Sequence, residues 1–176
     1  GGRGGQVAAP EPVRINEHPL VHGTWFVDAR VNLSQQTSYT VRAVVNGVEQ
    51  EPSAPFVIPA GAPPLPYLSI PLQLPEGYGA NDISTGDLDG DGAYDLVLKS
   101  EMRPRDNAHA GLTDATLLQG YKLDGTLLWT INLGKNVREG AHYTQFMVYD
   151  FDGNGRAEII AKTADGTIDG QGRVIG

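Results

Sequence analysis

Two loops of closely spaced carboxylates are the part of this sequence best suited to chemistry. Each loop alternates acidic or amide side chains with other residues, contains a glycine after the third of them, and ends on a further acid. The members are Asp87, Asp89, Asp91 and Asp95 in the first loop, and Asp150, Asp152, Asn154 and Glu158 in the second. Alternate carboxylates on a curled loop converge on one point, and Ca²⁺ takes about six to eight such oxygens. The backbone carbonyls of Ala93 and Arg156, directly after the glycines, can add to each set.

Neither loop fits an EF-hand, which needs a bidentate glutamate at the twelfth loop position and flanking helices. That position holds Leu98 in the first loop and Ala161 in the second, and both flanks read as strands. Asp-Gly-rich stretches also occur as plain hairpin turns. Two copies with the same closing acid, and the mutual repulsion of crowded carboxylates without a cation, favour metal binding. The sequence therefore predicts Ca²⁺ as the cofactor.

Short strand-like segments surround these loops. Apolar and polar residues alternate or cluster in 81–86, 95–99, 120–123 and 126–130, with an Asp124-Gly125 turn between the last two. The segments 144–149 and 158–162 repeat the first pair around the second loop. Four short strands per repeat, none able to bury both faces alone, are typical of a β-propeller blade. We expect residues 76–176 to begin a propeller, and because two incomplete blades cannot close a ring, we expect a fragment of a longer protein.

The residues before the loops have a different character. Residues 24–33 and 38–50 alternate as strands do, and Asn46-Gly47 favours a type I′ hairpin turn. Residues 1–58 are therefore predicted to form part of a β-sandwich-like domain. Residues 59–75 begin with a proline-rich stretch that is stiff and not helical, and we interpret them as a linker. The predicted fold class is all-β throughout.

A second polar cluster is expected at the end of the strands opposite the acidic loops. In an antiparallel pair, the start of the strand entering a loop and the end of the strand leaving it lie together. The residues placed there are Asn81, Asp82, Lys99, Glu101 and Asn107 from the first copy, and His142 and Tyr143 from the second. Such mixed groups suit a sugar-binding cleft, although each alone is also compatible with an ordinary solvated loop.

Composition excludes several other classes of protein. The chain has 176 residues, a formal charge of −8 and no cysteine, so it has neither disulfides nor thiolate chemistry. An acidic chain without a dense basic cluster predicts no nucleic-acid partner. No apolar run is long enough to predict a membrane span.

The order of several motifs resembles one known family. The motifs are Gly79-Ala80-Asn81-Asp82, the Asp-rich loop ending in Leu98-Lys99, Tyr121-Lys122-Leu123-Asp124-Gly125-Thr126, Gly140-Ala141-His142-Tyr143-Thr144-Gln145-Phe146, and Lys162-Thr163-Ala164-Asp165-Gly166-Thr167. Together they resemble rhamnogalacturonan lyases of polysaccharide lyase family 11. The resemblance implies a fibronectin-like β-domain, of which only the last part is present, followed by the first blades of an eight-bladed, calcium-binding propeller. The resemblance also implies that this segment packs against the rest of its own propeller.

The resemblance also implies a reaction and a set of residues. The reaction is calcium-dependent cleavage between rhamnose and galacturonate in rhamnogalacturonan I of pectin, by β-elimination in a secreted enzyme. Asn81 and Glu101 would contact substrate, joined by Lys99 and Asn107, and Asp82 would be a further calcium ligand. Glu101 stands where the family has an aspartate, one methylene shorter. His142 and Tyr143 are weaker catalytic candidates, and the base itself is not assigned.

Two other functions stay open at this stage. A non-catalytic, calcium-stabilised propeller for carbohydrate binding or adhesion has similar acidic loops. A structural module of a larger secreted assembly is the third interpretation. Convergence of Asn81, Lys99 and Glu101 at one end favours the lyase, because an adhesion module does not need it.

Overall fold

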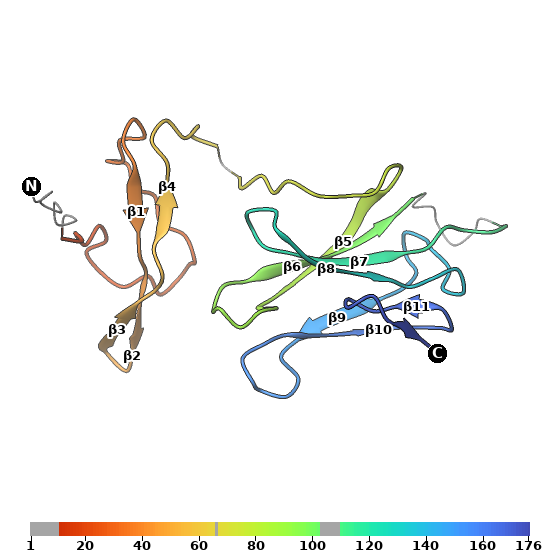
Figure 1. Ribbon diagram of the computed structural model, residues 1–176. Helices are drawn as coiled ribbons and strands as arrows, with labels where there is room; N and C mark the ends of the chain where they lie inside the picture. Colours follow the sequence, from red (N-terminus) through yellow and green to blue (C-terminus); the bar gives the residue numbers. More distant parts are fainter. Residues whose placement is uncertain (1–10, 66, 103–109) are drawn as a thin grey trace, which may run out of the picture. The chain divides into compact units, whose positions relative to one another are not determined.

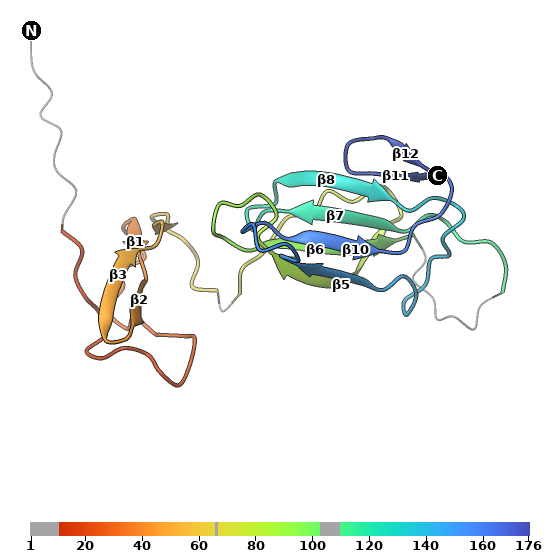
Figure 2. The same ribbon diagram turned by 90° about the horizontal axis from the view of Figure 1, so that it is seen from below.

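A computed structural model describes residues 11–65, 67–102 and 110–176. The chain divides into two compact units, Gly1–Tyr67 and Leu68–Gly176, and the division falls inside the predicted linker. Within the described residues the regular structure is entirely β, which confirms the predicted all-β class. No helix among them is long and apolar enough to cross a membrane. Figures 1 and 2 give two views of each unit.

Among the described residues, the first unit contains four short strands and the second contains eight. The strands are β1 (Thr37–Tyr39), β2 (Arg42–Val45), β3 (Val48–Pro52), β4 (Phe56–Ile58), β5 (Gly79–Gly86), β6 (Asp95–Glu101), β7 (Leu117–Tyr121), β8 (Leu127–Asn132), β9 (Phe146–Tyr149), β10 (Glu158–Ala161), β11 (Thr167–Ile168) and β12 (Val174–Ile175).

The first unit consists of two antiparallel pairs, β1–β4 and β2–β3. Asn46 and Gly47 join β2 to β3 with φ values of 51° and 79°, the two positive angles that a type I′ turn requires. The strand predicted within 24–33 is wrong, since these residues carry no strand and the Trp25 side chain is 75% exposed. Alternation alone does not make a strand when no partner strand pairs with the segment.

The second unit is built on a six-stranded antiparallel sheet in the order β12-β11-β8-β7-β6-β5. Strands β5 to β8 follow one another as a meander, as the four segments of the predicted repeat require. The turn before β8 lies at Asp124-Gly125, where Gly125 has φ +88°. Strand β11 then pairs with the free edge of β8, and β12 pairs with β11, so both extend the meander sheet. The sequence did not indicate this extension.

The β9–β10 hairpin, which carries the second acidic loop, forms a separate two-stranded sheet. It lies over one face of the meander in both views (Figures 1 and 2). Its apolar side chains, Phe146, Val148, Ala157 and Ile159 among them, pack on a buried cluster between the layers. That cluster consists of Leu88, Val97, Leu118, Leu133 and Val137. The core therefore fixes the second acidic loop relative to the first.

Candidate functional site

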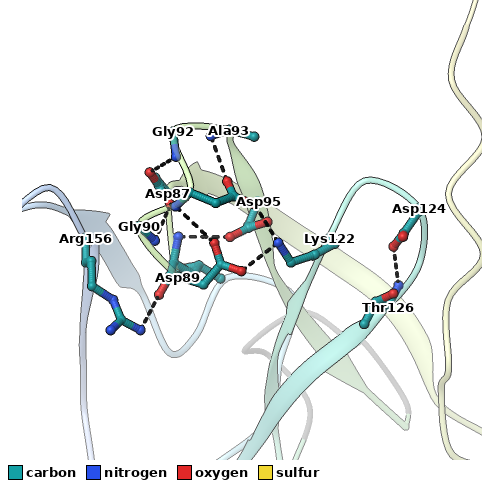
Figure 3. Close-up of polar contacts among 12 residues, drawn as sticks. Asp87, Asp89, Gly90, Gly92, Ala93, Asp95, Lys122, Asp124, Thr126 and Arg156 are labelled. Carbon is teal, nitrogen blue, oxygen red and sulfur yellow. Dashed lines mark hydrogen bonds and ion pairs between the residues drawn. The ribbon is translucent and has the colours of Figure 1, made fainter. Parts of the chain in front are cut away.

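The first acidic loop, between β5 and β6, is curled around the carboxylate of Asp87 (Figure 3). Asp87 Oδ1 accepts hydrogen bonds from the backbone N–H groups of Gly90 at 2.6 Å and Asp91 at 3.2 Å, and Oδ2 accepts one from Gly92 at 2.8 Å. Gly90 and Gly92 adopt φ values of +81° and +85°, which L side chains rarely adopt. The glycines thus permit the turn that places the loop around one carboxylate.

Three carboxylates of this loop meet at one point. Asp87, Asp89 and Asp95 each present an oxygen atom, and these atoms all lie within 4.8 Å of one another. Asp95 is buried, and its Oδ2 accepts a hydrogen bond from Leu88 N–H at 2.9 Å. Burial raises the pKa of Asp95 above the ordinary value for aspartic acid, because the desolvated carboxylate is disfavoured. A cation among these oxygens would relieve that cost.

Lys122, the residue directly after β7, supplies the positive charge that pairs with the first acidic loop (Figure 3). Its Nζ lies 2.6 Å from Asp89 Oδ2 and 2.7 Å from Asp91 Oδ2. The ammonium group lowers the pKa of the Asp91 carboxyl, mainly through its hydrogen bond. Sequence reasoning missed this contact. The pairing of Tyr121 with Leu96 places Lys122 beside the loop, so the register of the meander was the signal that could have found it.

The second acidic loop, between β9 and β10, repeats the hydrogen bonds of the first. Asp150 Oδ1 accepts from Gly153 at 2.7 Å, and Oδ2 accepts from Gly155 at 2.8 Å. Glu158 Oε2 accepts from Phe151 N–H at 2.9 Å, as Asp95 does from Leu88. Asp150, Asp152 and Glu158 also present oxygens within 4.8 Å of one another. The two copies are therefore alike in geometry as well as in sequence.

The two loops are in direct contact. Ala157 N–H donates to the carbonyl of Asp87 at 2.6 Å, and the Arg156 guanidinium donates to the Leu88 carbonyl at 3.4 Å. The Arg156 stem also lies over Gly90, where an added Cβ would be 2.9 Å from its Cγ (Figure 3). A change in the shape of one loop is thus transmitted to the other.

The donor set fits a hard cation in both loops, because three carboxylates converge in each and no softer ligand is among them. Asp91 is not among the three converging carboxylates of the first loop. Asp91 and Asn154 accept hydrogen bonds from the N–H groups of Ala93 and Arg156, at 2.9 Å and 2.8 Å, and both stay predicted ligands. The carbonyls of Ala93 and Arg156 stay predicted ligands.

At the opposite end of β5, a bulge brings two polar residues against β6. Ala80 pairs with Ser100 and Ile83 with Leu98, so Asn81 and Asp82 together face the single residue Lys99. A bulge of this kind redirects side chains and commonly lies beside functional sites. The predicted convergence of Asn81, Asp82, Lys99 and Glu101 at one end is therefore present.

Lys99 lies at the centre of this end, with 0% of its side chain exposed. Its Nζ lies 2.8 Å from Asp82 Oδ2, whose side chain is 56% exposed, and 3.8 Å from Glu101 Oε1. It also donates to the carbonyls of Tyr143 at 2.9 Å and Ala141 at 3.4 Å. The structure thus gives Asp82, the predicted further calcium ligand, an ammonium partner.

Glu101 is fully buried beside Lys99. Its Oε1 accepts a hydrogen bond from Gly140 N–H at 3.2 Å, while its Oε2 and the Oδ1 of Asn81 are buried acceptors without a partner among the described residues. Burial raises the pKa of the Glu101 carboxyl. Contact of Lys99 and Glu101 with substrate stays a prediction, and Asn107 lies outside the described residues.

The segment between β8 and β9 carries the candidate residues His142 and Tyr143 to the same end of the sheet as Lys99. His142 is exposed, and Tyr143 is half-buried with its ring 6.0 Å from the Arg138 guanidinium carbon. Thr144 has φ 60°, which is strained for a β-branched residue. Such strain is concentrated at functional sites. Backbone contacts of Ala141 and Tyr143 to Lys99 join this segment to the first copy.

The comparisons with known proteins agree on one family. Residues 67–176 match the model of the C-terminal domain of rhamnogalacturonan lyase family 11. The chain is 52% identical to rhamnogalacturonan endolyase YesW and 48% identical to rhamnogalacturonan exolyase YesX, both of Bacillus subtilis (strain 168), each over 174 residues. These alignments cover 93% of this chain but 27% and 28% of the relatives, so the chain spans about a quarter of their length.

Solved structures give the same result. A Bacillus licheniformis rhamnogalacturonan lyase of family PL11 aligns with a TM-score of 0.73 at 52% identity, covering 86% of this chain and 27% of that one. The crystal structure of YesW aligns with a TM-score of 0.72 at 52% identity, covering the same shares.

Proposed function

Because the chain belongs to rhamnogalacturonan lyase family 11, we propose that the protein carrying it cleaves the rhamnogalacturonan backbone of pectin by β-elimination. The observation that supports this most strongly is the identity of about half of all residues with two proteins named as rhamnogalacturonan lyases. Their names differ in endo and exo action, and the proposal is limited to the reaction they share.

The reaction sets clear demands on the protein. A base removes the proton at C5, α to the uronate carboxyl, and the bond to the oxygen at C4 breaks as the C4–C5 double bond forms. The developing charge on the uronate needs fixed positive or hydrogen-bonding groups, and the leaving oxygen needs a proton. Groups for these tasks must be accessible and held in place.

We assign the accessible groups of the polar end to substrate. Asp82 is exposed on the bulge of β5 and His142 on the segment held against it, with the half-buried Asn81 beside Asp82. Asn81 can hydrogen-bond a sugar hydroxyl, and the imidazole of His142 can accept or donate a proton. Tyr143 is the alternative proton donor. Lys99 and Glu101, which the resemblance places at substrate, lie beneath these groups in the structure.

The two acidic loops are proposed as Ca²⁺ sites, held by Asp87, Asp89 and Asp95 in one and by Asp150, Asp152 and Glu158 in the other. Bound there, the ion neutralises crowded carboxylates and stabilises the connections between strands. The loops lie at the opposite end of β5 and β6 from Asn81 and Glu101, so we assign them a structural role.

The finer architecture is part of the same proposal. The β5–β8 meander would be one blade of a propeller, with the β9–β10 hairpin beginning the next, and the first unit would be the remnant of a fibronectin-like domain. Secretion is proposed from the polymeric nature of the substrate.

Incubation of the full-length protein with rhamnogalacturonan I tests the proposal. We expect the ultraviolet absorbance of the unsaturated uronate product to rise, and homogalacturonan to give no rise. The variant His142→Gln should lose most of the activity, whereas His18→Gln, at an exposed histidine of the first unit, should keep it. Binding of the intact polymer without any product would instead identify a carbohydrate-binding propeller and refute the lyase.

A further inference from the structure

We propose that Lys99 and Glu101 are positioning residues that fix His142 relative to Asn81 and Asp82. Both side chains are fully buried and contact the segment bearing His142 through its backbone. The catalytic consequence rests on the proposed lyase function. The structural part of the inference does not, and it can be measured on its own.

Lys99 joins two elements that are far apart in the sequence. Its Nζ contacts Asp82 in the bulge of β5 at 2.8 Å, and the carbonyls of Ala141 and Tyr143 at 3.4 Å and 2.9 Å. The two carbonyls belong to the residues on either side of His142. A buried ammonium group must keep such partners, because losing them leaves an unpaired charge out of water. His142 is therefore held at a set distance from the bulge.

Glu101 acts on the same segment from the next inward-facing position of β6, since residues two apart in a strand share a face. Its Oε1 accepts the hydrogen bond of Gly140 N–H at 3.2 Å and lies 3.8 Å from Lys99 Nζ. The neighbouring residue Glu139 accepts from Met102 N–H at 3.1 Å, just beyond the end of β6. Successive residues before His142 are thus tied to one strand.

The strained backbone of Thr144 indicates that these contacts hold the segment in an unfavourable conformation. A β-branched residue with φ 60° keeps that conformation only where its surroundings impose it. Its neighbour Tyr143 is bound through its carbonyl to Lys99, and Thr144 Oγ1 donates to the Arg138 carbonyl at 3.2 Å. The contacts hold the backbone in a conformation that it would otherwise leave.

A role in stability alone explains this arrangement poorly. Well-packed apolar side chains in place of a buried ion pair are often equally stabilising, so charge at positions 99 and 101 is not needed for folding as such. Polar groups at these positions are needed to bind two carbonyls on either side of an exposed histidine and the N–H group of Gly140 just before them. The geometry therefore points to precise placement of His142 and the bulge.

The test uses the full-length protein with Lys99→Met, which keeps the length and apolar stem of the side chain but removes the ammonium group. Lys135→Met, at an exposed lysine on the same unit, is the matched control. We expect Lys99→Met to lower kcat on rhamnogalacturonan I by roughly 10- to 100-fold with little change in KM, because small misplacements of catalytic groups have effects of that size. In a His142→Gln background the same change should have almost no further effect.

A readout independent of activity comes from NMR with ¹³C-labelled histidine. The His142 side-chain signal should shift in Lys99→Met and stay unchanged in Lys135→Met. If wild-type protein shows no lyase activity, the proposed function fails and this comparison still decides the inference. An active wild type whose Lys99→Met variant keeps kcat and the His142 signal would overturn the inference.

Glu101 provides a second test if Lys99→Met does not fold. Glu101→Gln retains an oxygen that can accept from Gly140 N–H, whereas Glu101→Ala does not. We expect the glutamine variant to keep the His142 signal and most of kcat, and the alanine variant to lose both. Equal behaviour of the two variants would contradict a positioning role for this hydrogen bond.

Discussion

Gly86, the last residue of β5, provides a sharp test of how the two layers of the second unit pack. It is buried where the end of β5 meets the β9–β10 hairpin, directly before the carboxylate of Asp87. A Cβ added there would lie 2.6 Å from Ala157 Cβ and 2.8 Å from Val148 Cγ1. The change Gly86→Ala therefore presses on the hairpin that carries the second acidic loop.

The magnitude follows from the distances. Carbon atoms in contact are ordinarily about 3.5–4.0 Å apart, so the hairpin or β5 must move by about 1 Å. Overpacking of this kind costs about 1–3 kcal/mol. Gly79, at the other end of the same strand, is the matched control because an added Cβ meets nothing within 4 Å. Gly79→Ala should be neutral or should stabilise by up to about 1 kcal/mol, since it restricts the unfolded chain.

Urea unfolding of both variants, followed by hydrogen exchange at Val148 and Ala157, measures the effect. We expect Gly86→Ala to unfold at lower urea than the wild type and to exchange faster at both amides, with Gly79→Ala unchanged or slightly more stable. Equal midpoints for the two variants would show that the layers do not meet at Gly86, and the packing described above would be wrong.

Three further outcomes are expected. Tyr121→Phe removes the hydroxyl that accepts from Gln73 N–H at 3.1 Å, so it should cost about 1 kcal/mol and speed hydrogen exchange at Gln73. Burial raises the pKa of Glu101, so the folded state binds more protons than the unfolded state. This group's contribution to stability is present below the ordinary glutamate pKa and is lost as pH rises from there through the raised pKa of the folded state. The Glu101→Gln variant has no carboxyl at this position and therefore lacks that pH dependence. Urea unfolding should show that the free energy of unfolding of the variant, relative to the wild type, rises between pH 4 and pH 7. A chelator should lower the thermal midpoint and Ca²⁺ should restore it, and a midpoint indifferent to both would count against the metal sites.

Much of the second unit was predictable because local residue types determine it. Asp124-Gly125 and the repeated acidic loops specify turns, and turns fix the register of the strands beside them. That register places Asn81 and Asp82 against Lys99, as the antiparallel argument required. Local turn chemistry and strand direction were sufficient for the polar end to be identified.

Other features depend on contacts between segments that the sequence does not order. Residues 24–33 alternate like a strand but have no partner strand in the described first unit. The contact of Lys122 with the first acidic loop depends on the pairing of β7 with β6. Nothing local distinguishes Lys99, which is buried, from a surface lysine, because its burial is created by the segment around His142 some forty positions later.

A lysine pairs with carboxylates at each end of the β5–β6 pair, but the two lysines differ in their exposure to solvent. Lys122 is 29% exposed beside aspartates that are also partly exposed, so a cation from solvent can displace its ammonium group without leaving a buried charge. Lys99 has no exposed side-chain surface and binds backbone carbonyls as well as Asp82, so displacing its ammonium group would leave a buried charge unpaired. The first acidic loop can therefore respond to the cations in solution while the polar end keeps one geometry, which is what the proposed catalytic site needs from its supporting residues.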